Sequence, residues 1–220
     1  TIKGDLSGNE ELRVKWLAID GGRLCALLGP ALPVRTPFSF PIAHDLRLKQ
    51  TQSGKTVVAR DLDTGRPLWN HVEQATIDYH TIAVRGGRTY FYSEKTRLAC
   101  LNSEGRQLWE NSDTSWMAQL KRGPVRNANV EAVSTLRVGP EQVWLTIPGV
   151  NAASMFSAKD GSLLWQGRAA NTDLFVGDRF YTAGGAVNPA TGEVIQPGNF
   201  SIGGWCGIRT WVPALKSGLG

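Results

Sequence analysis

Short apolar runs separated by polar turns recur along this chain. One phrase occurs four times: an apolar-rich run, a polar tripeptide ending in Gly, and a second run closing on Leu-Trp or Val-Ile. The copies span residues 57–69, 98–109, 155–165 and 186–195. Alternating or aromatic runs this short are typical of strands and too short for helices. Each copy therefore predicts a β-hairpin.

Each predicted hairpin turns at a glycine. The turn tripeptides are Asp63-Thr64-Gly65, Ser103-Glu104-Gly105, Lys159-Asp160-Gly161 and Ala190-Thr191-Gly192. They suit a type I turn followed by a left-handed residue, a conformation that glycine adopts at little steric cost. We therefore expect positive φ at the four glycines.

The spacing of the hairpins predicts the architecture. A second phrase, a Gly-containing turn followed by an aromatic or β-branched run, occurs at residues 20–27, 86–92, 139–145 and 176–181. The hairpin glycines are 40, 56 and 31 residues apart, a mean of about 42, close to the ~40–45 of a four-stranded propeller blade. We predict an all-β fold, a β-propeller of about four to five four-stranded blades.

The predicted domain organisation is a single propeller domain over residues 1–220, either complete or part of a larger ring. The uneven spacing indicates loop insertions at about 30–55, where four prolines gather, and at about 111–130. Proline cannot donate a ladder hydrogen bond, which argues against central strands in the first insertion. In the second, a short helix around Trp116 is expected to cover one blade edge.

Five of the eight tryptophans fall into two groups. Trp69, Trp109 and Trp165 occupy the same position in the first three hairpins, which favours packing of these large rings between blades. Trp205 and Trp211 lie in a Gly-rich C-terminal stretch and have no repeat position. They are weak candidates for contact with a ligand.

Composition and charge change this picture little. The chain is 41% hydrophobic and 20% charged, with 24 basic and 19 acidic residues, which is typical of a globular domain. No run of basic residues is longer than Lys121-Arg122 and no stretch approaches the ~18 apolar residues of a membrane span. We expect neither a nucleic-acid partner nor a membrane span. The chain begins at Thr1 without a leader, so we expect a processed protein or an excised segment.

Candidate chemistry is sparse. Cys25, Cys100 and Cys206 match no metal or redox spacing, so one disulfide is allowed but none is required. The acidic turn before Gly65 lacks the closing Glu of a calcium loop, and His44, His71 and His80 lack the spacing of a zinc site. We predict no catalytic residue and no metal ligand, and the sequence identifies no cofactor-binding residue.

The hairpin phrase, with its Asp-x-x-Thr-Gly turn and closing Leu-Trp, resembles the repeat of the quinoprotein-type β-propellers, the pyrroloquinoline-quinone-like repeat family of bacteria. The resemblance covers about residues 14–195 and is strongest between Val57 and Asp113. Members are commonly exported and attached to other domains, and they usually close with about eight blades. The resemblance implies a periplasmic or secreted location.

The family implies two kinds of activity. Its dehydrogenases hold the quinone with a calcium ion on the propeller axis and carry a pair of adjacent cysteines, a pair absent from this sequence. Members resembling the outer-membrane assembly scaffold lack the cofactor and bind proteins or peptides. We therefore expect a non-catalytic scaffold that binds a protein, peptide or small ligand outside the cytoplasm, with no cofactor.

Two alternatives stay open. One is a dehydrogenase, or a fragment of one, that oxidises an alcohol or sugar with pyrroloquinoline quinone and calcium. The other is a sensory or adaptor module of a larger multidomain protein, whose partners would include the remaining blades or domains of a longer chain.

Overall fold

The computed structural model describes residues 12–31, 53–94, 96–113, 115, 134–146, 152–168, 174–182 and 185–198. Within these ranges the chain forms 15 β-strands, β1 to β15, and the described elements include no helix. The strands are antiparallel and form a seven-stranded sheet and two four-stranded sheets. The fold is all-β, as the sequence predicts.

The seven-stranded sheet contains two blades that share a strand. In chain order it runs through β1 (Leu12–Asp20), β2 (Arg23–Pro30), β3 (Ser53–Asp61), β4 (Pro67–Arg85), β5 (Arg88–Ser93), β6 (Arg97–Leu101) and β7 (Gln107–Asn111). The 19-residue β4 pairs with β3 over residues 67–72 and again at residues 77–78, and it pairs with β5 at Ile77 and over residues 82–85. Blade 1 is β1 to β3 with the first half of β4, and blade 2 is its second half with β5 to β7.

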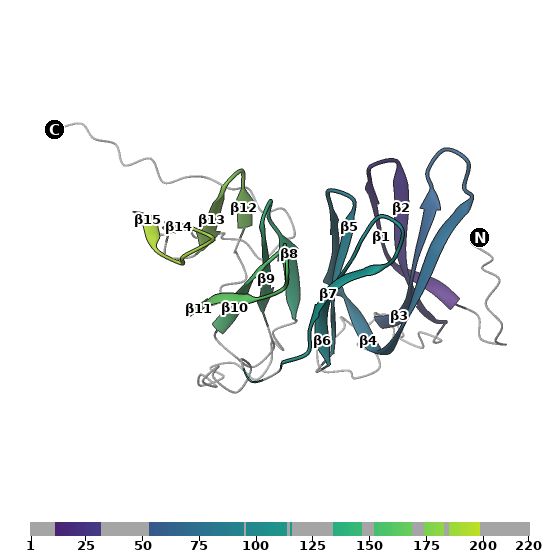
Figure 1. Cartoon of the computed structure of the whole chain (residues 1–220), viewed down its shortest axis with the longest axis horizontal. Coiled ribbons are helices and arrows are strands. Elements are labelled where there is room, and N and C mark those ends of the chain that lie inside the picture. Colours follow the sequence, from purple (N-terminus) through teal and green to yellow (C-terminus); the bar gives the residue numbers. More distant parts are fainter. Residues whose placement is uncertain are drawn as a thin grey trace, which may run out of the picture.

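The two smaller sheets are single blades. Blade 3 contains β8 (Thr135–Val138), β9 (Gln142–Thr146), β10 (Ala152–Ser157) and β11 (Leu163–Arg168). Blade 4 contains β12 (Leu174–Val176), β13 (Arg179–Thr182), β14 (Gly185–Val187) and β15 (Val194–Pro197). The blades follow one another in chain order across the molecule (Figure 1). The predicted four-stranded propeller blades are confirmed, and the described residues form four of them.

The turn between the last two strands of each blade has the expected backbone. Its glycine has a φ between 70° and 77° in all four blades, at Gly65, Gly105, Gly161 and Gly192. In blade 1, Asp61 accepts hydrogen bonds from the Thr64 amide at 2.8 Å and the Thr64 hydroxyl at 2.6 Å. These bonds hold the pKa of Asp61 below its usual value. Asp61 therefore stabilises the turn through these hydrogen bonds.

The hydrophobic core lies between neighbouring blades. Side chains alternate along a strand, so each sheet presents an apolar face to the blade on either side. Leu27 and Val57 of blade 1 pack with Phe91 and Leu101 of blade 2. The interface between blades 2 and 3 is centred on Leu98, Val143 and Phe156. The interface between blades 3 and 4 is centred on Trp144, Met155 and Phe180.

The predicted insertions lie largely outside the described residues, and the expected helix around Trp116 lies outside them too. Next to the first insertion, β2 ends at Pro30 and β3 begins at Ser53. Pro30 is the last residue of β2, a position where a missing N–H disturbs no further ladder bond. Cys25 and Cys100 are buried free thiols, and Cys206 lies outside the described residues.

Candidate functional site

The repeated tryptophans join each blade to the next one. A Cβ added to the turn glycine of the following blade would lie 2.5–2.8 Å from an indole atom, in the pairs Trp69–Gly105, Trp109–Gly161 and Trp165–Gly192. Such a distance is far inside van der Waals contact. The ring therefore occupies the space that any side chain at the glycine would need, which gives the glycine a second role beside its positive φ.

The same rings donate hydrogen bonds into the neighbouring turn. The indole Nε1 donates to a backbone carbonyl at 2.8–3.0 Å, in the pairs Trp69–Ser103, Trp109–Ala158 and Trp165–Pro189. At the first two interfaces an arginine of the same blade donates to that same carbonyl, Arg23 to Ser103 at 3.0 Å and Arg88 to Ala158 at 3.1 Å. We call the glycine turn that receives the tryptophan of the preceding blade the acceptor turn. At these two interfaces it contacts the indole ring and accepts hydrogen bonds from the indole N–H and from a guanidinium.

Blade 1 has an acceptor turn of the same kind without a docked ring. The Leu62 amide donates to the Gly22 carbonyl at 2.9 Å, as the Ala158 amide donates to Glu141 at 2.8 Å. A Cβ added to Gly65, however, would meet no atom of the described chain within 4 Å. The turn that begins the series of blades is therefore unoccupied by the described residues.

The face of blade 1 that points away from blade 2 is partly apolar and exposed. Trp16 packs into the interface with blade 2, so the next residue in the strand, Leu17, points to the opposite face. Leu17 and Ile19 in β1 and Val72 in β4 are 59%, 60% and 64% exposed. No described strand lies beyond blade 1 on this side (Figure 1). We call these three residues with the Gly65 turn the open face of blade 1.

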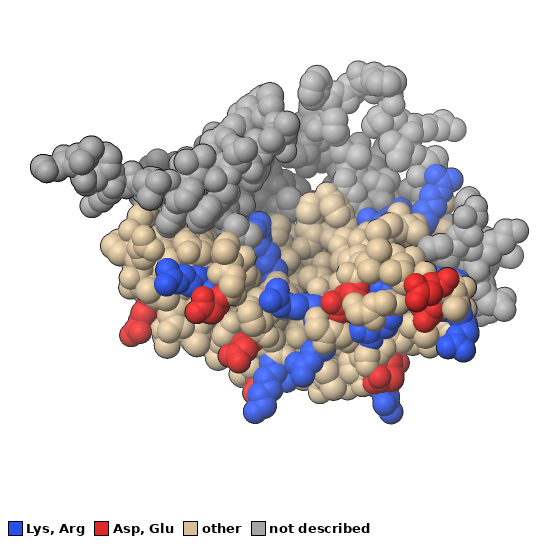
Figure 2. Space-filling model, turned by 90° about the horizontal axis from the view of Figure 1, so that it is seen from above, with Lys and Arg blue, Asp and Glu red and all other residues tan. Residues whose placement is uncertain are grey.

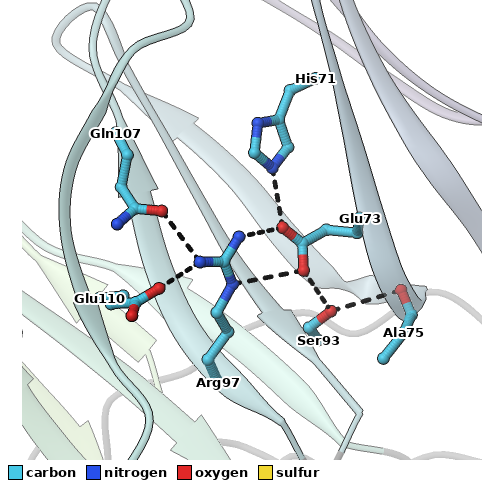
Figure 3. Close-up of polar contacts among 7 residues, drawn as sticks. All are labelled: His71, Glu73, Ala75, Ser93, Arg97, Gln107 and Glu110. Atoms are coloured by element: carbon cyan, nitrogen blue, oxygen red, sulfur yellow. Dashed lines mark hydrogen bonds and ion pairs between the residues drawn. The ribbon is translucent and has the colours of Figure 1, made fainter.

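A polar cluster ties the crossing segment of β4 to blade 2 (Figure 3). The side chain of Glu73 is only 3% exposed. Its carboxylate accepts hydrogen bonds from His71 Nε2 at 2.8 Å, from Ser93 Oγ at 2.9 Å and from Arg97 Nε at 3.3 Å. Arg97 Nη2 makes a further ion pair with Glu73. The same guanidinium reaches β7, where it pairs with Glu110 and donates to Gln107 at 2.9 Å.

The contacts of this polar cluster stabilise the fold and do not suit a catalytic role. Burial alone raises the pKa of Glu73, but the hydrogen bonds from His71, Arg97 and Ser93 outweigh it and lower the pKa to about 2. A carboxylate this acidic remains charged and is a poor general base near neutral pH. Ser93 donates to Glu73 and not to His71, so the three residues do not form the serine–histidine–acid relay of hydrolases.

An apolar residue is exposed at one repeat position of every blade. It lies three residues after the turn glycine, on the outermost strand, and is 39–51% exposed at Leu68, Leu108, Leu164 and Ile195. In every blade this residue lies at a β-bulge, where the register between the last two strands shifts by one residue. In three blades the docked tryptophan follows it directly. We call these four residues the apolar rim.

Charge does not gather on the face seen from above, where basic and acidic side chains are interspersed over the described surface (Figure 2). Within the described ranges no group of three or more His, Cys, Asp or Glu could hold a metal ion. The part of the chain that the structure describes contains no helix long and apolar enough to cross a membrane.

Several residues that the sequence analysis singled out do not belong to the features described above. Trp205 and Trp211, the weak contact candidates, lie outside the described residues, as does His44. His80 bonds its neighbour Asp78 at 2.8 Å. The Glu73–Arg97 pair escaped the sequence analysis because its members are 24 residues apart and neither belongs to a repeated phrase.

Comparison with known proteins identifies a family. The family model described as outer membrane protein assembly factor BamB matches residues 53–197. No curated protein matches the sequence. The chain is similar to the crystal structure of BamB from Moraxella catarrhalis, with 12% identity and a TM-score of 0.42, over 83% of this chain and 50% of that one.

Two other solved structures are similar at the same level. Quinohemoprotein alcohol dehydrogenase ADHIIG from Pseudomonas putida HK5 has 14% identity and a TM-score of 0.47, over 87% of this chain and 35% of that one. The computationally designed Ika8 protein has 12% identity and a TM-score of 0.45, over 81% of this chain and 44% of that one. The chain thus spans half or less of the length of all three structures.

Proposed function

This chain belongs to the BamB family of outer membrane protein assembly factors, and on that premise we propose that it is a protein-binding propeller module that works outside the cytoplasm. Its task in this proposal is to hold a polypeptide partner, with no catalytic residue and no cofactor. The family supports the class of function and the extracytoplasmic location, and the apolar rim supports the binding surface.

The apolar rim carries the proposal. Leucine or isoleucine stands at the same repeat position in all four blades and is 39–51% exposed, although a solvent-facing strand position accommodates polar residues without loss of packing. In repeat proteins a surface position that recurs from unit to unit forms a continuous binding surface. A protein partner that buries several rim residues at once gains the apolar area of each.

A binding titration with variants of the rim tests the proposal. The labelled 220-residue chain is titrated with a urea-unfolded outer membrane β-barrel protein, diluted to a urea concentration at which the propeller stays folded, and anisotropy is recorded. We expect saturable binding, weakened at least tenfold by Leu108→Lys with Leu164→Lys. Val176→Lys is the matched control, because Val176 is also exposed, at 47%, but lies on the first strand of blade 4.

Two results would contradict the proposal. One is the absence of saturable binding by a folded sample. The other is equal affinity of the rim variant and the Val176→Lys control, which would remove the rim from the binding surface.

The cofactor part of the proposal has its own test. Titration of the chain with pyrroloquinoline quinone, with and without calcium, is followed by tryptophan fluorescence. We expect no saturable quenching. Saturable quenching that requires calcium would instead favour the quinoprotein dehydrogenase and would justify an assay of alcohol or sugar oxidation.

A further inference from the structure

We infer that the apolar rim receives an amphipathic α-helix of the partner through side-chain contacts alone, and that a β-bulge in every blade prevents a partner strand from pairing there. The inference rests on the proposed function, because it names the kind of polypeptide segment that the rim holds. Its basis is the backbone around the four rim residues.

Each rim residue is the extra residue of a bulge. In blade 2 the residues on either side of Leu108 pair with consecutive residues of β6, Leu101 and Cys100, so Leu108 has no partner residue on that strand. The register shifts in the same way around the rim residues of the other blades, Leu68, Leu164 and Ile195. An extra residue disrupts the hydrogen-bonded ladder, bends the strand and increases its twist. At the rim, the outer strand of every blade therefore departs from regular strand geometry.

This backbone is unsuited to strand addition. A regular outer strand offers free N–H and C=O groups along its edge, and an extended peptide can add to such an edge. Bulges that twist the edge away are one of the devices by which proteins prevent this pairing. Two outer strands also contain proline, which has no N–H: Pro67 begins the outer strand of blade 1 and Pro197 ends β15. A partner strand would therefore find poor backbone pairing at the rim.

The side chains at the bulges are nevertheless suited to binding. A bulge on an exposed edge does not require an apolar side chain, yet leucine or isoleucine lies there in all four blades and is 39–51% exposed. In blades 3 and 4 the residue before the rim residue is also apolar and exposed, Leu163 at 37% and Val194 at 60%. The rim thus combines a backbone that disfavours a strand with side chains that favour an apolar surface.

An amphipathic helix fits both properties. Its backbone hydrogen bonds are made within the helix, so it needs no sheet edge. Its apolar residues recur at i, i+3, i+4 and i+7 and form one stripe, which binds an apolar surface through side chains. An extended segment instead gains affinity at a sheet edge from main-chain hydrogen bonds, and the bulges interrupt these bonds.

Two peptides of identical composition test the inference. Both contain the same numbers of Leu, Lys, Glu and Gln, have no net charge and carry a fluorescent label. One repeats leucine with the helical period of 3.6, and the other has leucine at every second residue. Anisotropy is recorded with the 220-residue chain at concentrations where sedimentation shows both peptides to be monomeric. We expect the helical-period peptide to bind saturably and at least tenfold more tightly than the alternating peptide.

Two variants of the chain separate the side chain from the bulge. Leu108→Lys with Leu164→Lys keeps both bulges and removes the apolar side chains, so it should weaken binding of the helical-period peptide at least tenfold. Deletion of Leu108 and Leu164 removes both bulges, because the residues on either side already pair with consecutive residues of the neighbouring strand. This deletion should strengthen binding of the alternating peptide at least tenfold. Urea unfolding checks the fold of both variants, and the lysine variant decides the test if the deletion variant is unfolded.

The inference is overturned if the alternating peptide binds the unchanged chain as tightly as the helical-period peptide, since the rim then accepts a strand. It is also overturned if the lysine variant binds the helical-period peptide with unchanged affinity, or if a folded deletion variant gains no affinity for the alternating peptide.

Failure of this inference is distinguishable from failure of the proposed function. If the unfolded outer membrane protein binds through the rim and the helical-period peptide does not bind, the proposed function holds and the helix is rejected. If none of the three probes shows binding that depends on the rim, both are rejected.

Discussion

Gly65 and Gly105 share a backbone conformation but differ in what surrounds them. Their φ angles are 70° and 77°. Glycine at these positions avoids the backbone strain that a residue with a side chain would introduce. Only Gly105 also lies against an indole, that of Trp69. A single repeat position therefore combines two physical requirements, and the two glycines allow them to be measured separately.

Alanine at each position should separate the two requirements. Gly65→Ala should cost roughly 1–2 kcal/mol of unfolding free energy, the price of a left-handed residue with a Cβ. Gly105→Ala should cost about 1–3 kcal/mol more, because the methyl group overlaps Trp69. Urea unfolding of both variants measures the difference. Equal losses would show that the ring moves aside freely.

The buried carboxylate Glu73 should make stability fall in acid. Its pKa is about 2 in the folded protein and roughly 4.3 in an unfolded chain. A lowered folded pKa stabilises the protein fully above the unfolded value, and this contribution of about 3 kcal/mol is lost as the pH falls from about 5 toward 2. Urea unfolding of wild type and Glu73→Gln across this range should show a shallower acid slope in the variant. Glu94→Gln, an exposed control on blade 2, should keep the wild-type slope.

At the scale of elements, the unit of this fold is the contact between one blade's outer strand and the next blade's turn. Trp109 in β7 illustrates it, since its ring packs on Gly161 and its Nε1 donates to Ala158 at 3.0 Å. The strand β4 adds a covalent link, because it is the outer strand of blade 1 and the inner strand of blade 2.

Truncation of the Trp109 ring should be among the most destabilising single changes in the molecule. Trp109→Ala should cost about 3–5 kcal/mol, the usual loss for a buried aromatic side chain. Trp109→Phe keeps most of the apolar contact and loses the hydrogen bond, so it should cost less. Chemical unfolding of the two variants gives both values. A loss within experimental error for Trp109→Ala would contradict the docking role.

At the scale of the whole molecule, stability should decline toward blade 4. Blades 2 and 3 are each packed between two described neighbours, whereas β15 at the far edge of blade 4 is exposed along its whole length. In repeat folds each unit is stabilised by its neighbours, and segments with few buried contacts open at low free energy. Native-state hydrogen exchange should show slower exchange in β5, β6 and β9 than in β13 and β14. Uniform protection across the blades would contradict this gradient.

Much of this architecture could be predicted because it depends on local patterns. Positive φ at a turn requires glycine whatever packs around it, so Gly65, Gly105, Gly161 and Gly192 were visible as turns. The polar cluster was not visible, because Glu73 and Arg97 meet only after β4 crosses from one blade to the next.

The sequence by itself determined the repeating unit of this protein: a four-stranded blade with a glycine turn and, in three of the four copies, a tryptophan at a constant spacing. Turn chemistry and side-chain alternation act over a few residues, so they can be read along the chain. Only the tertiary structure decided which residues of neighbouring blades contact each other. It placed the three repeat tryptophans on the next blade's glycine and buried Glu73 among its donors. It also left Gly65 without a described neighbour at the position of a Cβ and the apolar rim exposed. Those outcomes depend on contacts between segments distant in sequence, which no local pattern encodes.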